Sequence, residues 1–208
     1  MSEKRDTTLI LASTSPRRKQ LLEDAGLSFQ VVSPPGEEVA PEPGEDPAAY
    51  AERAAVAKGL ETATHLAATM EGEKWILAAD TVVTIGGEIL GKPEDDADAL
   101  RMLLRLTGVT HKVHTGFAII GPDGEKAFSK SVKTGVDFSK PARERLEAYV
   151  ATGEPHDKAG AYAIQGKGAF LVRSITGSYT NVVGLPVADV SKALADLGVL
   201  EKLQREKW

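Results

Sequence analysis

A mostly apolar run, "WILAADTVVTI" from Trp75 to Ile85, constrains the fold of this chain more than any other stretch. Its β-branched residues favour a strand, and its unusually apolar character is typical of a central strand covered on both faces. The run from Thr8 to Ser13, "TLILAS", predicts a second buried strand. Strands of this kind belong to α/β sheets whose faces are covered by helices.

Caps and apolar periodicity predict the remaining elements. Ser15 and Asp46 are N-cap residues, each followed by a proline suited to the first helical position. Helices are predicted over 15–26 and 46–69, from Asp95 or Asp96 onward, over 139–152, and last over 187–197, with Leu21, Leu22, Ala25, Ala99, Leu100, Leu103 and Leu104 facing inward. Further strands are predicted at 29–33, 112–120, 125–131 and 133–138, with loops and short strands over 154–186. The order predicts an α/β fold with a mixed sheet, in one large domain or two small ones of a 208-residue chain.

The composition excludes several classes of function. The chain has no cysteine, which rules out disulfides, thiolate nucleophiles and zinc–thiolate sites. Its net charge of −5 is a poor footprint for nucleic acid or an anionic membrane, so we expect neither as a partner. With no bilayer-length apolar run and no long apolar segment at the N-terminus, we expect a cytoplasmic location.

The stretch "GGEILGKP", Gly86 to Pro93, resembles a phosphate-binding loop that lacks its final hydroxyl residue. Its flanks are strand-like, and Gly86-Gly87 suits a two-residue hairpin turn. A hairpin is therefore the better interpretation, and Lys92 remains as a cation just beyond a strand.

Other charged residues are candidates for a binding site. Arg17 and Arg18 fall in the first turn of a predicted helix, where cations are unfavourable unless an anion is bound there. Two solvated arginines are the alternative. Asp80 ends the apolar run "ILAAD", where a strand-end carboxylate could hold a divalent cation or take a proton from water. A capping or turn aspartate is the alternative there.

The glycine- and alanine-rich stretch "HDKAGAYAIQGKGAF", His156 to Phe170, permits close backbone approach to a ligand. Lys158 is a candidate phosphate contact, and the amide of Gln165 could read a base edge. The histidines argue against a zinc hydrolase, because His111 and His114 should point to opposite faces of one strand and the other two are isolated. Together these residues point to a phosphorylated small molecule and magnesium, without fixing a reaction.

The stretches "LASTSPRRKQLL", "AADTVV", "GKP", "TGV", "DKAGAYAIQG" and "GSYTNVVGLP" resemble, in this order, the Maf (septum formation inhibitor) family. The resemblance covers about Thr8 to Leu197. It implies a nucleoside triphosphate pyrophosphatase of the inosine-triphosphatase-like fold. It further implies one domain over residues 1–208, an elongated mixed sheet flanked by helices, an active-site cleft between two lobes, and a homodimer. Family members use a divalent metal, Mg or Mn, and release a nucleoside monophosphate and pyrophosphate.

The resemblance also implies roles for single residues. Asp80 matches the proton acceptor that activates water, and Glu37 or Glu38 the second acidic position, with Glu38 favoured; Asp80 and Glu38 are the expected metal ligands. The residues expected to bind the substrate are Ser13, Arg17, Arg18, Lys58, Thr81, Lys92, Lys158 and Gln165.

Arg17 together with Gln165 is similar to the dTTP/UTP pyrophosphatase branch, since relatives acting on 7-methyl-GTP usually carry an aromatic residue and a glutamate there. Modified pyrimidine nucleotides are further candidate substrates. Limiting their incorporation is a candidate role, and the resemblance also implies a link to cell-division arrest. A 7-methyl-GTP pyrophosphatase is the alternative within enzymes. A nucleotide-binding regulator of septum formation with incidental hydrolysis is the alternative outside them.

Overall fold

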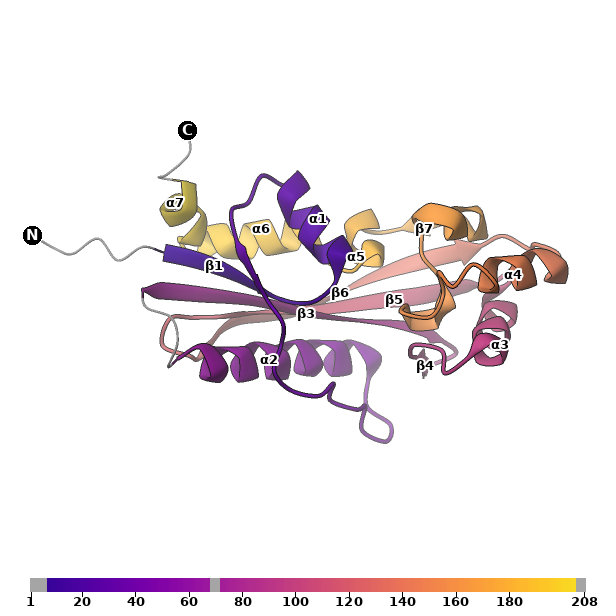
Figure 1. Ribbon diagram of the computed structural model, residues 1–208, viewed down its shortest axis with the longest axis horizontal. Helices are drawn as coiled ribbons and strands as arrows, with labels where there is room; N and C mark the ends of the chain where they lie inside the picture. Colours follow the sequence, from indigo (N-terminus) through magenta and orange to yellow (C-terminus); the bar gives the residue numbers. More distant parts are fainter. Residues whose placement is uncertain (1–6, 68–71, 205–208) are drawn as a thin grey trace, which may run out of the picture.

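The computed structural model describes residues 7–67 and 72–204. In these residues seven strands form one mixed sheet, ordered β2-β1-β3-β5-β6-β7, with β4 paired to β3 (Figure 1). Only β1 with β2 and β1 with β3 are parallel pairs. The predicted α/β class with a mixed sheet flanked by helices is confirmed. No helix in the described ranges has the length and apolar character needed to cross a membrane.

The elements alternate along the chain. The strands are β1 (Thr7–Ala12), β2 (Gln30–Val32), β3 (Glu73–Ile85), β4 (Glu88–Leu90), β5 (Thr110–Ile120), β6 (Lys126–Phe138) and β7 (Val172–Thr176). The α-helices are α1 (Pro16–Asp24), α2 (Pro47–Leu66), α3 (Asp96–Leu106), α4 (Arg143–Val150), α5 (Tyr179–Val183), α6 (Val187–Asp196) and α7 (Val199–Gln204). Two 3₁₀ helices, η1 (Ala159–Ala161) and η2 (Gly166–Leu171), lie between α4 and β7.

Strand β3 is the centre of the sheet, as its apolar sequence predicts. Its residues Leu77 and Ala79 pack in the core beneath α1 and α6, while Ile76 and Ala78 pack against α2 on the other face. Figure 1 shows α2 on one side of the sheet and α1, α5, α6 and α7 on the other. Both faces of β3 are therefore covered, which explains its lack of polar alternation.

The sheet is interrupted along one edge of β3. Strand β5 pairs with β3 from Ile76 to Thr84, so β1 and β4 share the opposite edge. Strand β1 pairs only as far as Ala78, and β4 begins to pair at Val83. Between these two points no strand of the described chain borders this edge of β3, while β5 continues along the other edge. The carboxyl end of β1 thus opens onto a stretch of β3 with a free edge, the kind of position where α/β sheets bind ligands.

This interruption corrects the prediction that Asp80 ends a strand. Asp80 lies within β3, which continues to Ile85, and it pairs with Gly116 of β5. The strand that ends here is its parallel neighbour β1, at Ala12. A carboxylate in the middle of a strand reaches a ligand site because the neighbouring strand stops short.

The hairpin at Gly86-Gly87 is confirmed. Ile85 pairs with Glu88, and both glycines have positive φ angles, 59° and 85°. Two successive positive φ angles are what a two-residue turn of type I′ requires, and glycine adopts them without strain. The phosphate-loop interpretation is thus excluded. The chain continues from the turn through β4 to Lys92.

Some boundaries differ from the predictions. The segments 125–131 and 133–138 form one strand, β6, and α4 begins at Arg143 because the Ser139 hydroxyl donates a hydrogen bond to the Phe170 carbonyl instead of capping a helix. Residues 179–183, in the stretch expected to contain only loops and short strands, form α5, capped by the Ser178 hydroxyl. The last described helix is α7 rather than α6.

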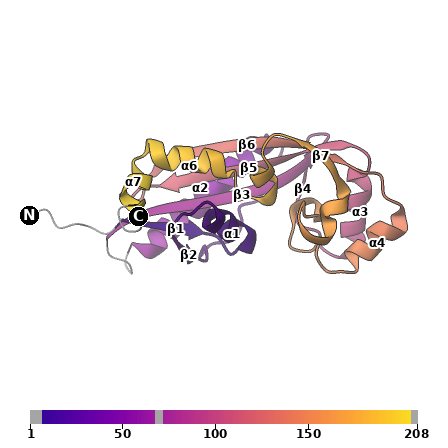
Figure 2. The same cartoon turned by 90° about the horizontal axis from the view of Figure 1, so that it is seen from above.

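The predicted end of the second helix at residue 69 lies outside the described residues, and α2 is described to Leu66. Of the side chains expected to face inward, Ala25 is exposed because it follows the end of α1, and Leu104 is 40% exposed because it lies beside the buried stripe of α3. Figure 2 shows the two ends of the molecule: α1, β1 and β2 at one, and α3, α4, β4 and β7 at the other. The predicted organisation, one domain of two lobes, stays a prediction.

Candidate active site

A cavity of about 650 Å³ opens at the interrupted edge of β3. Its walls come from the start of α1, from β3, from the chain after β4, and from the segments around η1 and α5. Every residue predicted to act in catalysis or binding lines it: Ser13, Arg17, Arg18, Glu38, Lys58, Asp80, Thr81, Lys92, Lys158 and Gln165. Glu37 lines only a small adjoining hollow, so the structure favours Glu38 as the acidic residue of the cavity.

The N-terminus of α1 forms one wall. Ser15 caps the helix by accepting a hydrogen bond from the Arg18 backbone N–H at 3.4 Å, and the buried Ser13 hydroxyl accepts one from the Ser15 N–H at 3.2 Å. Ser15 and Pro16, which begin the helix, thus place its N-terminus, with its partial positive charge, at the cavity.

The Arg18 guanidinium is anchored on three sides. It donates to the Gly184 carbonyl at 2.8 Å, to Ser13 Oγ at 3.3 Å and to Thr81 Oγ1 at 3.2 Å. Burial lowers the pKa of Arg18, and the nearby Asp80 carboxylate opposes this effect. The alternative of a solvated arginine is therefore wrong for Arg18. A fixed, partly desolvated cation facing a cavity is suited to binding an anion.

Asp80 and Lys58 form an ion pair in the cavity wall. The Lys58 ammonium, from α2, donates to Asp80 Oδ1 at 3.1 Å, and the two side chains are only 15% and 16% exposed. Asp80 is thus neither a helix cap nor a turn residue. The pair fixes one carboxylate oxygen.

Lys92 and Glu38 form a more exposed pair at the cavity's rim. Their Nζ and Oε1 atoms are 2.9 Å apart, with side chains 54% and 64% exposed. The hydrogen bond from Lys92 holds the pKa of Glu38 below its usual value. This contact links the Pro-rich loop after β2 to the segment after β4.

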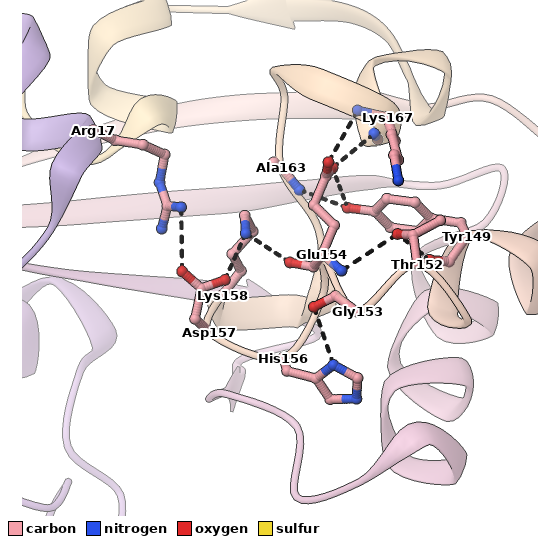
Figure 3. Close-up of polar contacts among 11 residues, drawn as sticks. Arg17, Tyr149, Thr152, Gly153, Glu154, His156, Asp157, Lys158, Ala163 and Lys167 are labelled. Atoms are coloured by element: carbon pink, nitrogen blue, oxygen red, sulfur yellow. Dashed lines mark hydrogen bonds and ion pairs between the residues drawn. The ribbon is translucent and has the colours of Figure 1, made fainter.

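Asp157 joins the two ends of the molecule across the cavity (Figure 3). Its carboxylate lies 3.4 Å from Arg17 NH1 of α1 and 2.5 Å from Lys158 Nζ. Burial raises the pKa of Asp157, but the bonds from Lys158 and Arg17 outweigh it and lower the pKa overall. Sequence reasoning gave this residue no role, although it stands directly before Lys158 in the "DKAG" stretch.

Thr81 lies on the face of β3 opposite Asp80, since adjacent residues of a strand alternate. Its hydroxyl shares a 2.9 Å hydrogen bond with Thr115 and accepts one from Arg18. The cavity therefore wraps around the free edge of β3, with the carboxylate on one face and the arginine on the other.

Gln165 lies at the far side of the cavity, between η1 and η2, and is exposed. Of the small residues before it, Ala159 and Ala163 line the cavity, whereas Gly160 packs against β3. A Cβ on Gly160, whose φ is +68°, would lie 2.9 Å from a methyl of Val83. The Gly160 N–H donates to the Gly91 carbonyl at 2.9 Å. Glycine there permits close approach to β3, within the protein, rather than to a ligand.

Two histidines make hydrogen bonds within the protein. His111 is buried, its Nε2 lies 2.8 Å from the Tyr162 hydroxyl, and burial lowers its pKa to about 4. His156 is exposed and contacts Asp96. Within residues 7–67 and 72–204, histidine and acidic side chains form no group of three or more that could hold a metal ion.

Comparisons with known proteins agree on one family. The sequence profile described as Maf-like protein matches residues 8–197. The dTTP/UTP pyrophosphatase of Geobacter sulfurreducens is 50% identical over 92% of this chain and 97% of its own. That of Geobacter metallireducens is 50% identical over 94% of this chain and 98% of its own, and that of Nitratidesulfovibrio vulgaris 50% identical over 92% and 89%.

Among the solved structures that match is a nucleoside-triphosphatase / dITP/XTP pyrophosphatase from Mycobacterium abscessus. It has a TM-score of 0.43 and 15% sequence identity, and the match covers 95% of this chain and 98% of that one. At this TM-score the likeness carries no argument about this chain.

Proposed function

Because the chain belongs to the Maf-like protein family, we propose that it is a pyrophosphatase that hydrolyses dTTP and UTP to the nucleoside monophosphate and pyrophosphate. The observation that carries this proposal is the cavity at the free edge of β3. It brings Asp80 together with cations from four separate segments of the chain. The names of relatives at 50% identity over most of the chain support the choice of nucleotides.

The cations would bind the triphosphate. Arg17 and Arg18 come from α1, Lys58 from α2, Lys92 from the segment after β4, and Lys158 from the segment before η1. Their charges would stabilise the negative charge that develops on pyrophosphate as it leaves. The Ser13 hydroxyl would add a neutral contact beside Arg18.

Asp80 would act as the general base. Its carboxylate takes a proton from a water molecule, whose oxygen attacks the α-phosphorus while the bond to the bridging oxygen breaks, and pyrophosphate leaves on the opposite side. The ion pair with Lys58 orients the carboxylate for this transfer. Positioning the water in line is the main requirement of such a reaction.

A divalent ion, Mg or Mn, is the proposed cofactor, held by Asp80 and Glu38. Magnesium sites on nucleotide enzymes use one or two carboxylates together with substrate phosphate oxygens. Asp80 and Glu38, which line one cavity, fit this coordination pattern. The described residues contain no cluster of three or more potential metal ligands. Such an ion, when bound, supplies further neutralisation of phosphate charge.

Gln165 and Thr81 would select the base. An amide can donate to O4 and accept from N3–H of thymine or uracil at once. Arg17 with Gln165 at these positions supports the dTTP/UTP branch of the family over the 7-methyl-GTP branch. We further propose a cytoplasmic homodimer that binds neither nucleic acid nor membrane, in keeping with the net charge of −5.

Pyrophosphate release tests the proposal directly. The panel is dTTP, UTP, CTP, 7-methyl-GTP and ATP, each with magnesium or manganese, and Asp80→Asn is the control. Fast release from dTTP and UTP that is lost in the variant supports the reaction and the role of Asp80. A preference for 7-methyl-GTP would keep the reaction and overturn the branch. Binding without any release would favour a regulator of septum formation instead.

A further inference from the structure

The turn after α4 connects the phosphate-binding side of the cavity to the segment that carries Gln165. Glu154 lies in this turn, close to Tyr149 of α4 and to residues 163–168 (Figure 3). Thr152 holds the turn by donating from its hydroxyl to the Tyr149 carbonyl at 2.7 Å and accepting from the Glu154 N–H at 3.3 Å. Neither Glu154 nor Tyr149 lines the cavity.

The Glu154 carboxylate is occupied by backbone donors. Its Oε1 accepts from the Gly168 N–H at 2.9 Å, and its Oε2 from the Lys167 N–H at 3.1 Å. Burial raises the pKa of Glu154, but these two bonds, with that from Tyr149, outweigh it and lower the pKa overall. The carboxylate therefore stays charged, and hydrogen bonds to a charged acceptor are the stronger ones.

Tyr149 completes the arrangement from inside the core. Its ring is only 3% exposed, and its hydroxyl donates to Glu154 Oε1 at 3.0 Å. The Tyr149 hydroxyl oxygen also accepts a hydrogen bond from the Ala163 N–H at 3.2 Å. Desolvation by burial raises the pKa of this hydroxyl, so it remains a neutral donor.

These bonds hold the chain on both sides of Gln165. Ala163 precedes it by two residues, while Lys167 and Gly168 follow it by two and three. The segment between them turns from η1 into η2 with Gln165 at the junction. Its side chain projects from a stretch of backbone that is fixed at both ends.

We infer that Glu154 and Tyr149 are positioning residues for base selection. They fix the backbone on each side of Gln165, so that its amide meets the pyrimidine edge in one orientation. This inference rests on the proposed function, in which Gln165 reads the base. The main chain of Glu154 also holds the phosphate-binding cation, because its carbonyl accepts from Lys158 Nζ at 2.6 Å.

The inference predicts a specific kinetic pattern. Loosening the segment should weaken discrimination between bases while the reacting phosphates, held elsewhere, keep their geometry. Thymine and cytosine differ in the donor or acceptor at this edge, so the ratio of kcat/KM for dTTP to that for dCTP is the sensitive quantity. A merely structural role would lower stability or the active fraction and leave this ratio unchanged.

The test compares Glu154→Gln and Tyr149→Phe with the wild-type protein. Glu154→Gln places an NH₂ group against a backbone donor, and Tyr149→Phe keeps the buried ring while removing both hydroxyl bonds. Glu147→Gln is the matched control, because Glu147 lies on the same helix and its carboxylate contacts only the exposed Arg143. Gln165→Ala reports whether base reading depends on Gln165 at all.

We expect both positioning variants to lower the dTTP/dCTP ratio about tenfold, the equivalent of roughly one lost base contact. Their kcat for dTTP should stay within about threefold of wild type, with KM rising, since base binding rather than chemistry is affected. Hydrogen exchange at the Lys167 and Gly168 amides should accelerate in both. Glu147→Gln should change none of these quantities.

Three outcomes separate the possible failures. An unchanged ratio in both positioning variants, while Gln165→Ala lowers it, overturns the inference and leaves the proposed function intact. If the dTTP/dCTP ratio of kcat/KM is unchanged in Gln165→Ala, Gln165 does not read the base, and the inference is wrong as well. Absence of dTTP hydrolysis by the wild-type protein overturns the proposed function itself. If Glu154→Gln does not fold, Tyr149→Phe alone decides between the first outcome and the expected one.

Discussion

The two sides of the cavity are built in different ways. The side proposed to bind the triphosphate, called the phosphate side below, carries cationic side chains that are neutralised by carboxylates: Lys58 by Asp80, Lys92 by Glu38, and Arg17 and Lys158 by Asp157. On the base side, Gln165 projects from a backbone segment that Glu154 and Tyr149 hold by hydrogen bonds to main-chain amides. One side is an array of exchangeable ion pairs, and the other is a fixed piece of main chain.

This difference suggests a division of labour. A triphosphate can compete with the exposed carboxylates of Glu38 and Asp157 for their cations, since its charge is larger. The more buried Lys58–Asp80 pair is the exception, because it orients Asp80 for the reaction. On the base side the hydrogen bonds to the main chain are not replaced by the ligand, so the orientation of Gln165 has to be set before the nucleotide binds. Changes on the phosphate side should therefore affect all nucleotides alike, and changes on the base side should affect their ratio.

Asp80→Asn should have the largest effect. Removing the proton acceptor should lower kcat by about 10³-fold for every nucleotide, within the range for general-base catalysis. Pyrophosphate release under saturating dTTP, UTP and dCTP measures this change. The circular dichroism spectrum and the oligomeric state should be unchanged.

The informative control for this variant is the dTTP/dCTP preference in nucleotide binding. If Asp80 belongs to the phosphate side alone, that preference should remain at its wild-type value. A shift in preference together with the loss of rate would break the division between the two sides. Turnover close to wild type would remove Asp80 as the base.

Arg18→Lys should have the next largest effect. Lysine keeps the charge but lacks the planar fork that reaches Gly184, Ser13 and Thr81 at once. We expect kcat/KM to fall roughly 10²-fold for all nucleotides, as when one fixed donor to a developing charge is lost. Steady-state kinetics measure it, and Lys19→Ala, at an exposed neighbour in α1, is the control. An effect confined to one base would contradict the assignment of Arg18 to the phosphate side.

The sequence singles out the charged residues of the phosphate side but gives no signal for the contacts that hold the base side, for a physical reason. Cations at a helix start are unfavourable unless an anion is bound there, so Arg17 and Arg18 stand out in the sequence alone. Asp80 stands out as the last residue of the apolar run "ILAAD", although its strand continues beyond it. The distances among these residues could not be predicted, since they depend on where β1 stops relative to β3. That register is set by long-range pairing, which no local pattern encodes.

The contacts that hold the base side could not be predicted from the sequence, because they are hydrogen bonds to main-chain amides. Glu154 accepts from Lys167 and Gly168, and any residue type can supply such donors, so no motif marks them. The same cause explains the missed helix α5, where the hydroxyl of Ser178 caps a segment whose valines favour a strand. Asp157 was overlooked because its partner Arg17 lies 140 residues away in the sequence.

Acid should destabilise the core beneath the base side. His111 contacts Tyr162, and burial lowers its pKa from 6.5 to about 4. Since the unfolded chain takes up this proton near its ordinary pKa and the folded protein does not, stability present above pH 6.5 is lost as the pH falls towards 4. At pH 5 this site should account for a loss of roughly 2 kcal/mol in the free energy of unfolding.

Urea unfolding at pH 7 and pH 5 measures this loss. In His111→Gln the drop between the two pH values should be smaller by that amount, although the variant is less stable at pH 7. His65→Gln, at an exposed position of α2, should keep the wild-type drop. An identical drop in His111→Gln would show that other groups cause the acid sensitivity.

The smallest expected effect distinguishes two ion pairs within the phosphate side. The Lys92–Glu38 pair is exposed, with side chains 54% and 64% exposed, so Lys92→Met should change the free energy of unfolding by less than about 0.5 kcal/mol. Lys58→Met should lower the free energy of unfolding by about 2 kcal/mol, because it leaves Asp80, only 16% exposed, without its partner.

Both variants should bind the triphosphate more weakly, since each loses one cation of the array. Urea unfolding and nucleotide binding measured on the same samples separate these quantities, with Lys192→Met as the exposed-pair control. Equal destabilisation by both variants would mean that the Lys92–Glu38 pair stabilises the fold. A triphosphate would then separate this pair less easily than its exposure indicates.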